Sequence, residues 1–431
     1  MIRRLLYVFP TLFLIELVLG GPGTWLTFGG LSLRKLFFAG TLGSLWLLAP
    51  LTGRWRLRAG EVAGLLLLLA TLLLWIGLVP VLRNTNLAWA VGDADALLML
   101  FMYFPLAHLV RSGDLDWVRV SRMLMVLTGI VAVGQLAIWL FVQWKPELAG
   151  IVSFGVGTAL GGTGIYVGGM PDGFFRVMWI SSLFGVFAFF LSLRPEFASR
   201  WRPLVIALFA TMLFVSYTRA FWLGVVLGLG LVAVQRVPGL LSRASVRTTR
   251  RGAVAAVAGT ALLLAAAAFK GEAIGESLVR RFASTFDLTE DVSNAIRVDQ
   301  FAALVDVWEE QPLLGTGFGG YAPQYLRSTE DPYSYELVSV ALLMKTGVAG
   351  VLLVLSALAA LVARAWLAAR RADQEGWLAN WLGMVVAFLL AIQTNPFLFN
   401  FVGIALVLFL LLDIVRIERA ATPAQPSAAA G

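Results

Sequence analysis

The sequence contains no cysteine and only one histidine, His108, among its 431 residues. Without cysteine, the chain forms no disulfide and has neither a thiolate nucleophile nor a zinc–thiolate site. A single histidine leaves little room for imidazole metal ligands or for a histidine-based triad. His108 itself is predicted to be packed or interfacial. Any chemistry must therefore rest on Arg, Lys, Asp, Glu, Tyr and Ser side chains.

Charge is also scarce. Charged residues make up 13% of the chain and hydrophobic residues 59%, with a mean hydropathy of +0.85. A typical soluble domain is about one quarter charged. A water-soluble fold of this composition would leave too much apolar surface uncovered. The composition therefore excludes a soluble enzyme, a nucleic-acid-binding domain and a disordered protein.

Long apolar runs predict membrane spans, since roughly 18 consecutive apolar residues cross a bilayer as a helix. Twelve such runs are present, at about 5–20, 34–51, 62–82, 95–110, 122–143, 174–193, 203–218, 220–235, 252–269, 336–363, 377–394 and 398–415. We interpret the first run as a retained helix and not as a cleaved signal peptide. The predicted fold class is an all-α integral membrane protein with about 12 transmembrane helices.

The basic residues predict the orientation of these spans. With the N-terminus in the cytoplasm, 21 of the 33 Lys and Arg residues fall in cytoplasmic segments, and most acidic residues fall on the other side. This is the distribution of the positive-inside rule. The pI near 10.1 is then mainly a topology signal and predicts no nucleic-acid partner. Both termini are expected in the cytoplasm.

The spacing of the spans predicts the domain organisation. Residues 1–269 hold spans one to nine, 270–335 a large extracytoplasmic loop, 336–416 spans ten to twelve, and 417–431 a disordered cytoplasmic tail. A second external segment, 144–173, is rich in glycine. It fits either close backbone approach to a ligand or a flexible surface loop.

The large loop contains one clear amphipathic pattern, RVDQFAALVDVWEEQP. Phe301, Leu304, Val305 and Trp308 recur at helical spacing and predict one apolar face. Pro312 ends this helix, and the turn-rich segment GTGFGGY follows. Such a helix can lie on the bilayer surface or cap a cavity.

Three local motifs carry a resemblance to a known family. SYTRAFWLG (216–224) matches the pattern Ser-x-Ser/Thr-Arg-Gly/Ala-x-Trp/Phe-Leu. NAIRVDQFAALVDVWEEQPLLGTGFGGY matches an arginine, a helix and a Pro-x-x-Gly-x-Gly-x-Gly turn, and ELVSVALLMKTGVAG matches the start of the next span. With the large loop between spans nine and ten, the chain resembles the O-antigen polymerase and O-antigen ligase superfamily of bacterial class C glycosyltransferases.

The resemblance implies sugar transfer from an undecaprenyl-diphosphate-linked oligosaccharide, with inversion and without a metal or other cofactor, in the bacterial inner membrane. Arginine suits a diphosphate, because its planar fork binds phosphate oxygens in pairs. Arg219 and Arg297 stand at the arginine positions of the motifs and are the predicted catalytic cations. Arg176, Arg280 and Arg281 are weaker substrate-binding candidates, with interfacial anchoring or lipid head-group contact as the alternatives.

Glu336 is the predicted general base. Ligases of this superfamily usually carry a histidine eleven residues before a glycine of the next span, and counting back from Gly347 reaches Glu336. This departure favours the polymerase branch. Tyr333 and Tyr335 flank Glu336 and could stack on sugar rings or belong to an interfacial aromatic belt. Asp93 and Asp95 could hold a divalent cation, but ordinary helix-start acids are the favoured interpretation.

Two other functions remain open. One is an O-antigen ligase that transfers the glycan to lipid-A core or to protein. The other is a lipid-linked oligosaccharide flippase or transporter, which the absence of a repeat between the two halves disfavours. The expected partners are the lipid-linked donor and acceptor and the bilayer, and the resemblance also allows a chain-length regulator.

Overall fold

The computed structural model describes residues 2–20, 27–28, 31–52, 55, 57–159, 165–169, 175–240, 292–326, 328–329, 331–393 and 397–421. Helices dominate these residues. They are α1 (Ile2–Leu19), α2 (Leu33–Leu48), α3 (Ala59–Leu72), α4 (Val79–Leu82), α5 (Leu87–Ala94), α6 (Tyr103–Ser112), α7 (Trp117–Trp144), α8 (Ala149–Ala159), α9 (Leu183–Ser192), α10 (Arg202–Val215), α11 (Arg219–Leu240), α14 (Val292–Glu309), α15 (Val338–Arg371), α16 (Glu375–Ile392) and α17 (Phe401–Ala420). The described residues also form two antiparallel strand pairs, β1 (Thr27–Phe28) with β2 (Leu31–Ser32) and β3 (Ile165–Gly169) with β4 (Phe175–Trp179).

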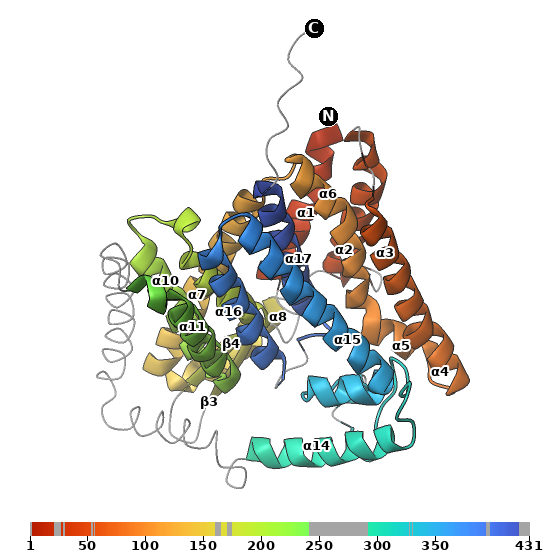
Figure 1. The fold of residues 1–431 in the computed structure, drawn as a ribbon. Helices are drawn as coiled ribbons and strands as arrows, with labels where there is room; N and C mark the ends of the chain where they lie inside the picture. The colour runs from red at the N-terminus through yellow and green to blue at the C-terminus, as the bar shows by residue number, and fades with distance from the viewer. Residues whose placement is uncertain are drawn as a thin grey trace.

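Helix α9 lies at the centre of the packing. All ten of its residues are buried, and α7, α10, α16 and α17 contact it. A helix that is apolar on every side is stable only inside such a bundle. Figure 1 shows α1 beginning and α17 ending at the upper end of the view, while α14 lies across the lower end. The bundle therefore carries the loop helix α14 at the end opposite to these helix termini.

Five of the described helices are long and apolar enough to cross a membrane: Ala59–Leu82, Leu87–Ser112, Trp117–Trp144, Val338–Arg371 and Glu375–Ile392. Shorter apolar helices are Leu6–Leu19, Ile180–Ser192, Arg202–Val215 and Arg219–Val234. These findings confirm a mainly helical membrane protein, while the count of twelve spans stays a prediction. The predicted span 252–269 lies outside the described residues, as do 270–291 and 422–431.

The mainly helical class holds, but the predicted span 174–193 does not begin as a helix. This segment begins as strand β4, which pairs with β3 in the register Val167 to Val177. The strand is tied to α7, because the Gln135 side-chain amide donates to the Val177 carbonyl at 2.8 Å. A short apolar run with aromatic and β-branched residues fits a strand as well as a helix, so hydropathy alone could not separate the two.

Two of the long apolar helices are interrupted. A π-helical segment occupies Leu73–Leu78, and α15 has a non-helical residue at Gly347, with φ of +63°. The turn that follows α14 pairs with both interruptions: the Phe318 amide donates to the Trp75 carbonyl (2.9 Å), and the Gly317 amide donates to the Lys345 carbonyl (2.8 Å). Irregular backbone in apolar surroundings is stable only with such partners.

Glycine is required where this turn approaches the helices. Gly319 has φ of +76°, and a Cβ built on it would lie 2.4 Å from the Ala90 nitrogen. Gly315 has φ of +67°, and its Cβ would lie 2.4 Å from the Met344 oxygen. Both the left-handed backbone and the close contact exclude larger residues. The GTGFGG segment thus fastens the loop to the membrane helices.

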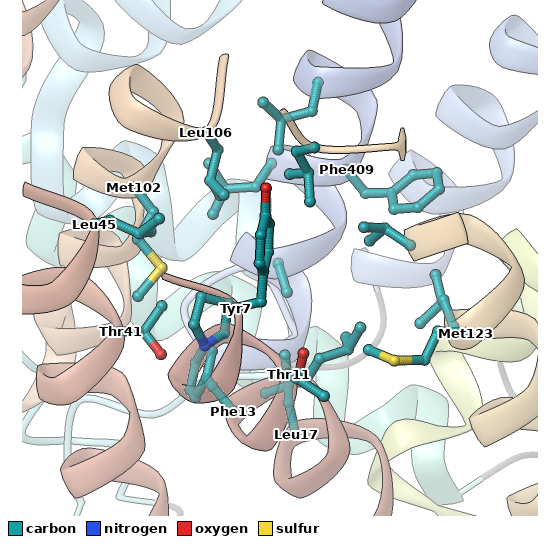
Figure 2. Close-up of a pocket in the computed structure, with 18 of the residues that line it drawn as sticks. Tyr7, Thr11, Phe13, Leu17, Thr41, Leu45, Met102, Leu106, Met123 and Phe409 are labelled. Carbon is teal, nitrogen blue, oxygen red and sulfur yellow. The ribbon is translucent and has the colours of Figure 1, made fainter. Parts of the chain in front are cut away.

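The interior of the bundle also contains a small apolar cavity of about 150 Å³. Figure 2 shows it among residues of α1, α2, α7 and α17, with Tyr7, Phe13 and Thr41 labelled on its wall. Thr41 is buried, and its hydroxyl has no hydrogen-bond partner among the residues that the structure describes. Neither residues of α14 nor the residues flanking Glu336 are among those that line this cavity.

Candidate active site

The structure brings two of the three predicted catalytic side chains into contact. Arg297 lies on α14, and Glu336 lies two residues before α15 begins. The Arg297 guanidinium and a Glu336 carboxylate oxygen are 3.2 Å apart. Their side chains are 23% and 26% exposed, so the pair is partly desolvated but still accessible. This ion pair links the loop helix to the start of a membrane helix.

The Gln300 side chain fixes the backbone at Glu336. Its side-chain oxygen accepts hydrogen bonds from the amides of Glu336 (3.0 Å) and Leu337 (2.9 Å). Gln300 is buried and lies three residues after Arg297, so both side chains project from one face of α14. Gln300 was not among the residues predicted from the sequence, although its i+3 spacing from Arg297 places it on the same face of the helix. α14 therefore positions both the side chain and the backbone of the candidate base.

The predicted apolar face of α14 is partly wrong. Phe301 is 51% exposed, whereas Ala303 and Leu304 are buried against Tyr335 and α15. The helix is rotated so that Gln300 faces α15 in place of Phe301. Gln300 can occupy this buried position because its oxygen is satisfied by the two amides at the start of α15.

The two tyrosines beside Glu336 have different surroundings. Tyr335 is only 2% exposed, and its hydroxyl accepts a hydrogen bond from the Ala322 amide at 2.6 Å. Burial raises the pKa of Tyr335 to about 12. Tyr333 is half-buried and donates to an Asp331 carboxylate oxygen at 2.9 Å, and burial also raises its pKa. Because Tyr335 is buried, we assign it to packing and not to the predicted contact with a sugar. Tyr333 remains a candidate for contact with a sugar ring.

The predicted cations Arg176 and Arg219 meet at one break between two helices. α10 ends at Val215 and α11 begins at Arg219. The Arg176 side chain, on β4, donates to the Ser216 carbonyl (2.9 Å) and to the Thr218 hydroxyl (3.3 Å). Arg176 therefore supports the backbone directly before Arg219, which is itself half-buried. The remaining candidates, Arg280 and Arg281, lie outside the described residues.

Asp93 and Asp95 do not share a partner. Asp93 forms a buried ion pair with Lys345 at 2.6 Å and accepts the Gly319 amide at 2.8 Å. Asp95 pairs with Lys35 at 3.1 Å near the surface. Each carboxylate is thus engaged by its own lysine. Lys345 was missed in the sequence, although a lysine inside a long apolar run is expensive and requires a partner.

These features define a polytopic helical membrane protein with a charged loop helix held against its spans. Residues 204–355 match a family model described as O-antigen ligase, and this range includes Arg219, Arg297 and Glu336. The match confirms the predicted resemblance to the O-antigen polymerase and ligase superfamily of membrane enzymes. Comparison with curated proteins gives no match.

Proposed function

We propose that this protein is a membrane glycosyltransferase that polymerises undecaprenyl-diphosphate-linked oligosaccharide units into a surface polysaccharide such as O-antigen or exopolysaccharide. The contact between Arg297 and Glu336 carries this proposal. It places an accessible carboxylate and a fixed cation together within the range of residues that matches the O-antigen ligase family. We place the protein in the inner membrane, with α14 on the extracytoplasmic side.

In the proposed reaction, a hydroxyl of the acceptor sugar attacks the anomeric carbon of the donor. The bond from that carbon to the diphosphate breaks, and the lipid diphosphate leaves with the electron pair. A Glu336 carboxylate oxygen accepts the proton of the attacking hydroxyl. Arg297 orients this carboxylate at 3.2 Å, and Gln300 fixes its backbone. Attack opposite to the leaving group inverts the anomeric centre.

Arg219 is the proposed ligand of the departing diphosphate. Its guanidinium stands at the first residue of α11, where helix amides also favour negative charge. A bidentate guanidinium stabilises the charge that develops on the leaving group. Arg176 acts through the backbone it holds at Ser216 and so keeps Arg219 in place. Arg280 and Arg281 remain further candidates for binding the lipid diphosphate.

The main alternative is an O-antigen ligase, and a transporter is the second. The test uses purified protein in detergent with the lipid-linked oligosaccharide alone and then with a lipid-A-core acceptor. A ladder of products without the core acceptor supports a polymerase. A single transfer that requires the core acceptor supports a ligase. Movement of the oligosaccharide across vesicles without any new glycosidic bond would support a transporter.

The decisive variant is Glu336→Gln, which keeps the size of the side chain and removes its ability to accept the proton. We expect a loss of at least about 100-fold in turnover, the lower range for a general base. Glu309→Gln is the matched control, because Glu309 is an exposed acid at the end of α14, the helix that carries Arg297. Polymer of wild-type amount and length from Glu336→Gln would overturn the assignment of the base.

A further inference from the structure

A groove of about 530 Å³ lies between α7 and α10, on the side of the bundle where both helices begin. The turn at Pro195–Phe197 closes one side of it. Arg122 and Arg202 stand at its mouth, close to the starts of α7 and α10. None of the residues proposed for sugar transfer lines this groove.

Both walls of the groove change from charged to apolar in the same direction. On α7, Arg122 is followed by Met125 and Gly129, and on α10, Arg202 is followed by Val205 and Phe209, all lining the groove. Seven residues of helix span about 10 Å. The two helices run in parallel, since Gln135 of α7 donates to the Met212 carbonyl of α10 deeper along both. The groove therefore has a cationic mouth and an apolar floor about 10 Å long.

The positive charge at the mouth is not cancelled by the acid beside it. Glu196 is engaged by Arg416 at 3.1 Å and by Arg194 at 3.6 Å. Arg202 donates to the backbone carbonyls of Ser192, at 2.8 Å, and Leu193, and these bonds fix its guanidinium beside the groove. Arg122 is exposed and has no hydrogen-bond or ion-pair partner within the described part of the chain. The mouth is thus built to receive an anion.

The surroundings of the groove belong to a membrane. Val126 of α7 lines the groove and is exposed, and Leu204 of α10, next to the lining residue Val205, is an exposed apolar side chain as well. Trp201 is exposed at the mouth. Tryptophan at the start of an apolar helix is typical of the membrane interface. The floor at Gly129 is open, because a Cβ built there meets no atom within 4 Å. An elongated apolar chain can therefore follow the groove away from the arginines.

We propose that this groove binds an anionic glycerophospholipid. Arg122 and Arg202 contact the phosphate of the head group, and one acyl chain lies along Gly129 between the two helices. The charge of the mouth selects an anionic over a zwitterionic head group. The length of the apolar floor selects a lipid over a free phosphate ion.

The test measures lipid bound to the purified full-length protein after its native lipid is removed. Phosphatidylglycerol and phosphatidylcholine with identical acyl chains are added in detergent, and bound lipid is counted by native mass spectrometry. We expect phosphatidylglycerol to be retained preferentially, also with excess inorganic phosphate. Arg122→Gln should weaken its retention about fivefold. Gly129→Leu should fill the floor and displace the acyl chain, with no loss of helix stability.

Two matched controls distinguish binding in this groove from nonspecific electrostatic attraction of an anionic lipid to the protein surface. Arg119 is 83% exposed and pairs with Asp116 at 3.2 Å, and it does not line the groove. Gly230 of α11 has open space around a built Cβ, as Gly129 does. Arg119→Gln and Gly230→Leu should retain phosphatidylglycerol as the wild type does. The proposal is overturned if the wild type retains the two lipids equally, or if inorganic phosphate displaces phosphatidylglycerol. It is also overturned if Arg119→Gln and Arg122→Gln lose equal amounts of bound phosphatidylglycerol, or if Gly129→Leu leaves its retention unchanged.

Discussion

Replacing Lys345 by Met should strongly destabilise the protein, because it leaves the Asp93 carboxylate buried without its cation. Both side chains are almost completely buried, and the ammonium lies 2.6 Å from one Asp93 oxygen and 2.7 Å from the other. The same ammonium donates to the Tyr333 carbonyl at 2.9 Å. After the substitution, the carboxylate keeps only the Gly319 amide among these contacts. The pair therefore fastens α5, α15, the glycine turn and the segment before Glu336.

The expected cost follows from the burial of the pair. Removing one partner of a buried ion pair typically costs about 3–5 kcal/mol in the free energy of unfolding. Neutralising both partners costs less, since no unpaired charge remains in the interior. The double variant Lys345→Met, Asp93→Asn should therefore recover a large part of the stability that Lys345→Met loses. Because the pair also holds Tyr333, transfer activity should fall in the single variant even below its unfolding temperature.

The assay is thermal unfolding of the purified protein in one detergent, with the two single variants and the double variant forming a mutant cycle. Lys35→Met is the matched control, because Lys35 pairs with Asp95 at 3.1 Å near the surface, where such a pair contributes about 0–1 kcal/mol. The prediction is wrong if Lys345→Met and Lys35→Met are equally stable, or if the double variant is no more stable than Lys345→Met.

Three further predictions test other parts of the structure. Arg219→Lys keeps the charge but loses the fork and should lower transfer at least about tenfold in the polymerisation assay, whereas Arg83→Lys, at an exposed arginine, should not. Thr41→Val removes a buried hydroxyl that has no partner in the described part of the chain, and it should raise the free energy of unfolding by about 1 kcal/mol. Thr211→Val should lower the free energy of unfolding, because the Thr211 hydroxyl donates to a backbone carbonyl at 2.8 Å; thermal unfolding of both variants is the measurement. The pKa of Tyr335 is about 12 in the folded protein against 10.0 as its ordinary value, so its contribution to stability is complete below pH 10 and is lost as the pH rises toward 12. Tyr335→Phe should make unfolding less dependent on pH in this range, and an unchanged dependence would contradict it.

The helical membrane class and the position of several helix ends were predictable, because they depend on local hydropathy. The predicted boundary between the spans 203–218 and 220–235 falls at Arg219, where α11 begins. The strand β4 was not predictable in this way, since its apolar run is also compatible with a helix. Its identity depends on pairing with β3 across the chain.

The candidate site was predicted as separate residues and not as an arrangement. Motif spacing pointed to Arg297 and Glu336 individually, but their contact depends on how α14 lies against the start of α15. The same packing rotates Phe301 outward and Gln300 inward. The helical spacing of apolar residues predicts that α14 has one apolar face. It does not predict which polar residue at the edge of that face is buried with a hydrogen-bond partner.

The location of the site follows from where the membrane helices are interrupted. The π segment at Leu73–Leu78 and the break at Gly347 both leave backbone groups that need partners, and the turn after α14 supplies them. In apolar surroundings, such unpaired groups would each cost several kcal/mol. The loop therefore stabilises the interrupted helices, and the interrupted helices fix the loop that carries Arg297. The loop and the interrupted helices complete each other's backbone hydrogen bonds. A substitution such as Gly319→Ala should therefore disturb the position of Glu336, although Gly319 does not contact it. In this sense the glycines of the turn and the Arg297–Glu336 pair form one structural unit.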